Sequence, residues 1–204
     1  MAKHVVPFVG LTGGMGAGKS TALAALERLG AATISSDAVV HELWAGDEQL
    51  RQAVLERWGP EVAPGGVIDR SAVAERAFAT PEDRVWLEGL LWPLVGARVA
   101  AWLDEARAEP APGAARPRAA VAEVPLLFEA GQQAIYDATI AVVSDEELRR
   151  ERAAARGHAS VDERAARQLS QEQKAQLATF VVRNDGTPQE LEQELSAVLD
   201  KLDR

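Results

Sequence analysis

The sequence contains no cysteine, and this absence excludes several kinds of site at once. Without thiols the chain has no disulfide, no thiolate metal site and no cysteine nucleophile, which agrees with a reducing compartment. The histidines His4, His41 and His158 are isolated and have no partner at ligand spacing. We therefore assign none of them to a metal.

Long apolar runs and a positive net charge are also absent. No stretch approaches about 18 uninterrupted apolar residues, and the start, MAKHVVPFVG, has no cleavage-like site. The formal net charge of -9 argues against broad binding to nucleic acid or acidic membranes, since both need a positive face. We expect a soluble cytoplasmic protein with no nucleic-acid partner and no membrane.

What is present favours one packed domain, because the 204 residues are 47% hydrophobic. Short apolar strands alternate with helical patterns, and we expect the strands at 8–11, 31–35, 119–124, 138–144 and 179–184. This pattern predicts an α/β fold with a five-stranded parallel sheet covered by helices on both faces. Ligands of such sheets bind at the carboxyl ends of the strands.

Several helix boundaries can also be expected. One helix should begin at Ala38 and the pattern continues to a stop at Gly59. Thr80 with Pro81 marks the start of a long helix, and Thr187 with Glu190 forms a capping box for the last one.

The stretch GGMGAGKST, residues 13–21, matches the phosphate-binding pattern G-x-x-x-x-G-K-[ST] between a strand and a helix. Its glycines let backbone N–H groups converge on an anionic oxygen, and Lys19 can reach the β- and γ-phosphates. The Ser20 hydroxyl can bind magnesium (Mg2+). A glycine-rich turn with a chance GKS is the alternative, and the position after a strand disfavours it.

Two features bear on the fate of the phosphate. Asp37 follows the second strand, where a general base for an acceptor hydroxyl would lie, although it could instead cap the next helix. Cations are concentrated between Arg149 and Arg183, and they either cover the phosphates or form a solvated helix face. Together these features favour a small-molecule kinase over an ATP-binding regulatory switch.

The chain resembles the dephospho-CoA kinase family over nearly its whole length, in segments that follow in this order: LTGGMGAGKST, ISSD, LLWPLV, EVPLLFEAG, RAAAR with Gln168 and Lys174, and RNDGT. The resemblance implies transfer of the γ-phosphate of ATP to the ribose 3'-hydroxyl of dephospho-CoA, the last step of coenzyme A synthesis. It also implies a nucleotide-kinase-like P-loop core at about 1–37, 119–145 and 179–204. A helical acceptor-binding region would occupy 38–109, and a lid 146–178.

The resemblance also implies residue roles. Asp37 would face the 3'-hydroxyl, and Arg152 and Arg156 would neutralise the transferred group. The ATP contacts would be Gly13, Gly14, Met15, Gly16, Ala17, Gly18, Lys19, Ser20, Thr21, Asn184 and Gly186, with Mg2+ on Ser20. The acceptor side would comprise Trp92, Pro93, Pro125, Leu126, Leu127 and Glu129.

The chain departs from the family pattern in three places. Ser35 stands where the family usually has an aspartate, Trp92 where it has a histidine, and Ala178 with Thr179 where it has Ala-Asp. An indole donates one N–H and mainly stacks, so Trp92 affects the acceptor contacts more than the reaction. Another nucleotide kinase of the same fold remains the alternative enzyme. Glu123 could hold magnesium through water, and Glu129 could be a structural cap.

Overall fold

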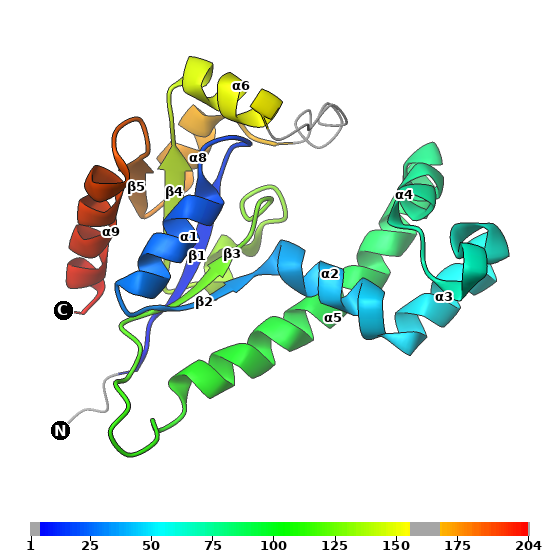
Figure 1. The fold of residues 1–204 in the computed structure, drawn as a ribbon, viewed down its shortest axis with the longest axis horizontal. Helices are drawn as coiled ribbons and strands as arrows, with labels where there is room; N and C mark the ends of the chain where they lie inside the picture. Colours follow the sequence, from blue (N-terminus) through cyan, green and yellow to red (C-terminus); the bar gives the residue numbers. More distant parts are fainter. Residues whose placement is uncertain (1–4, 156–167, 204) are drawn as a thin grey trace. The chain divides into compact units, whose positions relative to one another are not determined.

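The computed structural model describes residues 5–155 and 168–203 of the chain. Its centre is a five-stranded sheet in the order β2-β3-β1-β4-β5, in which every neighbouring pair is parallel (Figure 1). The strands are β1 (Phe8–Gly13), β2 (Ala32–Ser35), β3 (Ala120–Glu123), β4 (Ala138–Val143) and β5 (Phe180–Arg183). The predicted five-stranded parallel sheet is therefore confirmed.

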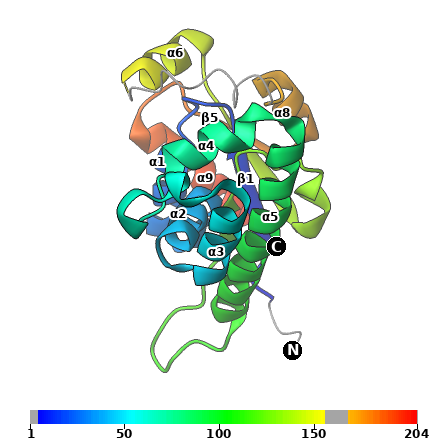
Figure 2. The same ribbon diagram turned by 90° about the vertical axis from the view of Figure 1, so that its right-hand side faces the viewer.

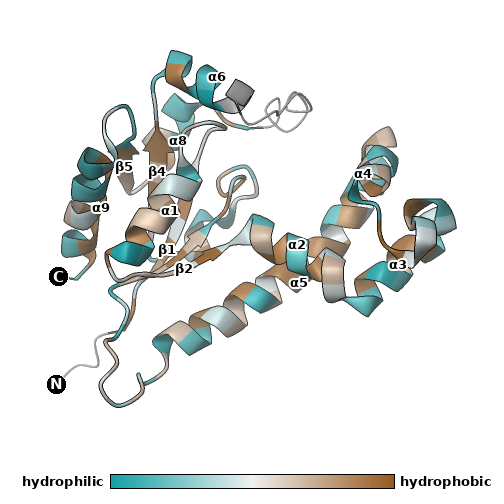
Figure 3. Ribbon diagram, in the orientation of Figure 1, coloured by the Kyte–Doolittle hydropathy of each residue, from teal (hydrophilic) through white to brown (hydrophobic). Residues whose placement is uncertain are grey.

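The central strands are apolar because both of their faces are covered. Every residue of β1, β3 and β4 is buried, as expected for parallel strands between two helical layers. Figure 3 shows β4 as hydrophobic and the helices around the sheet as mixed. The register sets Leu11 of β1 beside Ile140 of β4 and beside Glu123, the last residue of β3, and the carboxyl ends of these parallel strands lie on the same side of the sheet.

Helices cover the two faces of this sheet. Helix α1 (Lys19–Arg28) and helix α9 (Pro188–Leu202) lie on one face, and α8 (Gln171–Leu177) lies on the other (Figure 2). Leu26 of α1 and Leu195 of α9 are both fully buried, and they belong to the hydrophobic core that these helices form with the sheet. Burial of each such side chain stabilises the fold by about 1.5–3 kcal/mol. The short helix η3 (Gln132–Ile135) precedes β4, and helix α6 (Glu146–Ala155) follows β4.

The chain divides into two compact units, Met1–Ser35 with Leu103–Arg204, and Ser36–Trp102. The second unit is helical and buries Leu50, Val54 and Val73. Its rings Trp58 and Trp86 pack edge to face with centroids 5.1 Å apart. Its elements are α2 (Ser36–Gly46), α3 (Glu48–Trp58), η1 (Pro60–Val62), η2 (Pro64–Gly66), α4 (Arg70–Ala79) and most of α5 (Pro81–Arg107).

Helix boundaries confirm some predictions and correct others. Thr80 donates to and accepts from Asp83, and Thr187 forms the predicted capping box with Glu190. The prediction of continuous helix up to Gly59 is wrong. The Asp47 side chain accepts from the N–H of Leu50 at 2.8 Å and so caps a new helix, α3.

Among the helices of the described residues, none is long and apolar enough to cross a membrane.

Candidate functional site

The loop between β1 and α1 has the backbone that its glycines allow. Gly16 and Gly18 have φ angles of 74° and 92°, in the left-handed region that favours glycine. A Cβ at Gly16 would collide with the backbone carbonyl of Arg149, and one at Gly18 with the side-chain amide of Asn184. The loop is therefore packed closely against two other segments, and neither position has space for a side chain.

The first turn of α1 presents its polar groups at the end of this loop. Lys19 Nζ donates to the carbonyl oxygens of Gly13 and Gly14 at 3.0 and 3.2 Å. Ser20 and Thr21 are exposed, and the first turn has no acidic residue. The positive end of the helix dipole is thus not offset by a neighbouring carboxylate of that turn, which suits an anionic ligand.

The residue after β5 supports the glycine-rich loop from the side. Asn184 is only 7% exposed, and its Nδ2 donates to the carbonyl of Ala17 at 2.9 Å. Arg152 Nη1 in turn donates to the carbonyl of Asn184 at 3.0 Å and to Ser144 Oγ at 3.2 Å. The Asn184 side chain, predicted to be an ATP contact, thus donates to the phosphate-binding loop itself.

The cations between Arg149 and Arg183 differ in the contacts that they make. Arg149 Nε donates to the carbonyl of Met15 at 3.1 Å, a contact that sequence analysis missed. Arg150 is exposed and pairs with Glu146 one turn earlier, so the solvated-face interpretation fits Arg150 and not Arg149. The signal that could have separated them is helical spacing, because Arg149 and Arg152 are three residues apart. Arg156 lies outside the described residues.

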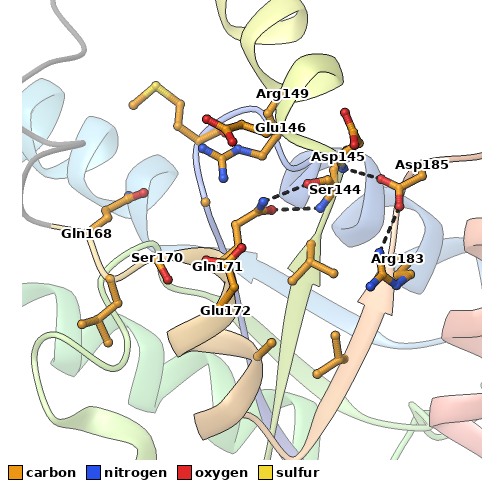
Figure 4. A pocket seen from close by; sticks show the side chains of 16 residues that line it. Ser144, Asp145, Glu146, Arg149, Gln168, Ser170, Gln171, Glu172, Arg183 and Asp185 are labelled. Atoms are coloured by element: carbon orange, nitrogen blue, oxygen red, sulfur yellow. Dashed lines mark hydrogen bonds and ion pairs between the residues drawn. The ribbon is translucent and has the colours of Figure 1, made fainter.

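A pocket of about 580 Å³ lies between α6, α8 and the ends of β4 and β5, with Gly14 and Met15 in its wall (Figure 4). The Gln171 side chain extends from α8. It donates to the carbonyl of Ser144 at 2.8 Å and accepts a hydrogen bond from the N–H of Ser144 at 2.9 Å.

Asp185 also lines this pocket. Burial raises the pKa of Asp185, but hydrogen bonds from the N–H of Asp145 and from Ser144, and then the contact with Arg183, hold that pKa below its usual value.

Glu123 ends β3, where it lies between Leu11 of β1 and Ser35 of β2, and it is 8% exposed. Its Oε2 accepts a hydrogen bond from Ser35 Oγ at 2.8 Å. At the position where the family resemblance expects aspartate, Ser35 thus supplies a donor instead of a second carboxylate.

Among the described residues, few side chains are placed to bind a divalent cation. Within residues 5–155 and 168–203, no three His, Asp or Glu side chains gather as a metal site. A magnesium ion held mainly by phosphate oxygens needs few protein ligands, so the exposed Ser20 hydroxyl fits such an ion.

The segment after β3 is tied to α8 by a buried lysine. Lys174 Nζ lies 2.9 Å from Glu129 Oε1 and donates to the carbonyl of Pro125 at 2.7 Å. Burial lowers the pKa of Lys174, and its contact with Glu129 opposes that shift. The structure thus gives Glu129 a buried ionic partner, and its Oε1 also accepts the backbone N–H of Leu169, just before α8, at 2.8 Å. Lys174 is one of the residues that carry the family resemblance, but helix periodicity gives no sign of its burial, since a lysine in a short polar helix looks exposed.

The other residues predicted for the acceptor side differ in exposure. Leu127 is fully buried and packs against Gly10, whereas Pro125 and Leu126 are half-buried. In the helical unit, Trp92 is 50% exposed within α5, and Pro93 beside it is also exposed.

Asp37 is exposed in the first turn of α2, which begins at Ser36 and not at Ala38 as predicted. The residue therefore lies inside the helix and does not precede it, so its alternative role as N-cap is wrong. A carboxylate in a first turn is still favoured by the helix dipole.

Comparisons with known proteins agree on one family. A model described as dephospho-CoA kinase matches residues 7–190. Curated dephospho-CoA kinases include that of Deinococcus radiodurans, 37% identical over 96% of this chain and 92% of the relative. That of Protochlamydia amoebophila is 34% identical over 95% of each chain.

Solved structures give the same fold. A Thermus thermophilus protein superposes with a TM-score of 0.78 at 33% identity and covers 98% of both chains. A dephospho-CoA kinase from Campylobacter jejuni superposes with a TM-score of 0.61 at 20% identity, over 96% of this chain and 97% of that one. The second likeness supports the α/β kinase fold alone.

Proposed function

The chain belongs to the dephospho-CoA kinase family, and from this premise we propose how its residues carry out the reaction. The protein transfers the γ-phosphate of ATP to the ribose 3'-hydroxyl of dephospho-CoA, giving coenzyme A and ADP, the last step of coenzyme A synthesis. The observation that carries this conclusion is the glycine-rich loop between β1 and α1, in a chain that matches the family over residues 7–190.

On the ATP side, the backbone of Gly13–Thr21 holds the phosphates. The closed packing around Gly16 and Gly18 supports this role, because a loop fixed in place loses little entropy when it binds. Lys19 exchanges the two neutral carbonyls of its own loop for phosphate oxygens, and charge-assisted hydrogen bonds are the stronger kind. Asn184 shapes the loop, and Gly186 lies on the adenine side.

Ser20 is the protein ligand that we propose for magnesium. A bound magnesium ion supplies neutralisation of the phosphate charge. Glu123, with one oxygen already used by Ser35, would act on it only through water. Since the reaction consumes ATP, we also propose that the protein acts in the cytoplasm.

On the acceptor side, Asp37 orients the 3'-hydroxyl and accepts its proton, and its exposure supports this role. The charge of the transferred group is neutralised by Arg152, together with Arg156. The guanidinium of Arg152 donates to two neutral oxygens, so its positive charge is available to an anionic group. Trp92 with Pro93, and Pro125–Glu129, contact dephospho-CoA.

These roles assign the chain's regions. The phosphate-binding core comprises about 1–37, 119–145 and 179–204, and the acceptor-binding region comprises 38–109. Residues 146–178 form a lid that carries the arginines.

The test is an ADP-release assay over a panel of acceptors: dephospho-CoA, AMP, CMP, shikimate and none. We expect rapid turnover with dephospho-CoA alone, because the acceptor hydroxyl is the nucleophile. Comparable rates with AMP or CMP would refute the acceptor assignment. Slow ADP release without any acceptor, stimulated by a protein partner, would point to a regulatory switch.

A further inference from the structure

Lys174 has the largest fully buried side chain among the described residues. Lysine is almost never fully buried unless its charge is paired. Its ammonium group has three donors, and the structure places three acceptors around it. These are Glu129 Oε1 at 2.9 Å, the carbonyl of Pro125 at 2.7 Å and Thr12 Oγ1 at 3.4 Å.

The three acceptors come from segments that are far apart in sequence. Thr12 lies on β1 directly before Gly13, the first residue of the phosphate-binding loop, and its Oγ1 also donates to the carbonyl of Pro125 at 3.3 Å. Glu129 Oε1 accepts from the N–H of Leu169 at 2.8 Å. One ammonium group therefore joins β1, the segment after β3 and the helix α8.

Stability alone does not account for this arrangement. Two charges taken out of water lose hydration, and well-packed apolar residues of similar volume are often at least as stable. The second oxygen of Glu129, Oε2, is buried and has no hydrogen-bond partner, which adds a further cost. What the lysine provides that an apolar residue does not is a set of directional bonds to three segments.

We propose that Lys174 is a positioning residue of the reaction, which holds Pro125–Glu129 at a set place relative to the phosphate-binding loop and so aligns the acceptor with ATP. The inference rests on the proposed function, which assigns Pro125–Glu129 to the acceptor side. Lys174 is buried and acts through Thr12, Pro125 and Glu129, without contact to either substrate.

The test is steady-state kinetics with Lys174→Met, which keeps the length of the side chain and removes its donors. We expect kcat/KM for dephospho-CoA to fall about tenfold to a hundredfold, as a misplacement of about 1 Å does, while the KM for ATP stays within about threefold. Lys201→Met, an exposed lysine of α9, is the matched control and should behave as the wild type.

A second control separates positioning from a general loss of stability. Leu199→Ala removes a fully buried side chain of α9 and should lower the melting temperature with normal KM values for both substrates. If Lys174→Met shows the same pattern as Leu199→Ala, with no change toward dephospho-CoA, the positioning role is overturned.

A milder variant keeps the test decisive where Lys174→Met fails to fold. Thr12→Val removes one acceptor of Lys174 and leaves the pair with Glu129, so we expect a rise of about threefold to tenfold in the KM for dephospho-CoA. An unchanged KM in Thr12→Val overturns the inference. Wild-type protein that fails to use dephospho-CoA would instead refute the proposed function, so the two failures are distinguishable.

Discussion

At the scale of single residues, the proposed chemistry depends most on the carboxylate of Asp37. Asp37→Asn keeps the size and polarity of the side chain but removes the proton acceptor. We expect turnover to fall by about 10²–10⁴, the usual contribution of general acid–base catalysis. Binding of ATP, measured by displacement of a fluorescent nucleotide, should stay within a few fold.

The control for this variant lies on the same helix. Glu42→Gln neutralises another exposed carboxylate of α2 and should leave turnover unchanged. Near-normal turnover of Asp37→Asn would remove its proposed role as a base. A variant that no longer binds ATP would show that Asp37 supports the nucleotide or its magnesium ion.

At the scale of elements, the phosphate-binding loop is held by its neighbours as well as by its own glycines. The residue after β5 donates to the loop through Asn184, and α6 donates to it through Arg149. These contacts join residues more than a hundred positions apart, so the loop depends on the packing of the whole unit Met1–Ser35 with Leu103–Arg204, here called the sheet unit.

Removal of the Asn184 side chain tests this support. Asn184→Ala leaves the carbonyl of Ala17 without its partner, and an unsatisfied buried acceptor costs about 1–3 kcal/mol. Because the loop itself loosens, we expect the KM for ATP to rise about tenfold, with a much smaller effect on the KM for dephospho-CoA. Both constants come from the same ADP-release assay.

Gln193→Ala is the matched control, since it removes an exposed amide side chain from α9. It should change neither KM. Equal losses toward both substrates in Asn184→Ala would contradict a local effect on the loop and would indicate general damage to the fold.

At the scale of the whole molecule, the proposed ATP contacts all belong to the unit Met1–Ser35 with Leu103–Arg204. Hydrogen exchange measured with and without ATP and magnesium should therefore slow most at 13–21 and 184–186, and little in α3 and α4. At about 100 times its dissociation constant, ATP should stabilise the folded protein by about 2.7 kcal/mol.

The acceptor should give a different protection pattern. Dephospho-CoA alone should protect α2 and α5, where Asp37 and Trp92 lie. Protection of α3 and α4 by ATP as strong as that of residues 13–21 would contradict the assignment of the nucleotide to the sheet unit.

The sequence by itself determined the features that arise from neighbouring residues. The apolar strands, the glycine-rich loop before α1 and the capping box of Thr187 with Glu190 are all local patterns, and the structure has each of them. Asp47 was also a local signal, but the helical pattern on both sides of it concealed the break between α2 and α3. The family motifs identified the reaction because they contain the residue types that the reaction requires.

Only the tertiary structure decided which distant side chains meet. Asn184 donates to Ala17 across 167 positions, and Lys174 reaches Thr12 across 162. No periodicity or propensity contains these contacts, because they follow from the strand order β2-β3-β1-β4-β5 and from the helix that covers each face. A lysine in a short polar helix is expected in water, and the sheet packed against α8 turns it into a buried ion that joins three segments.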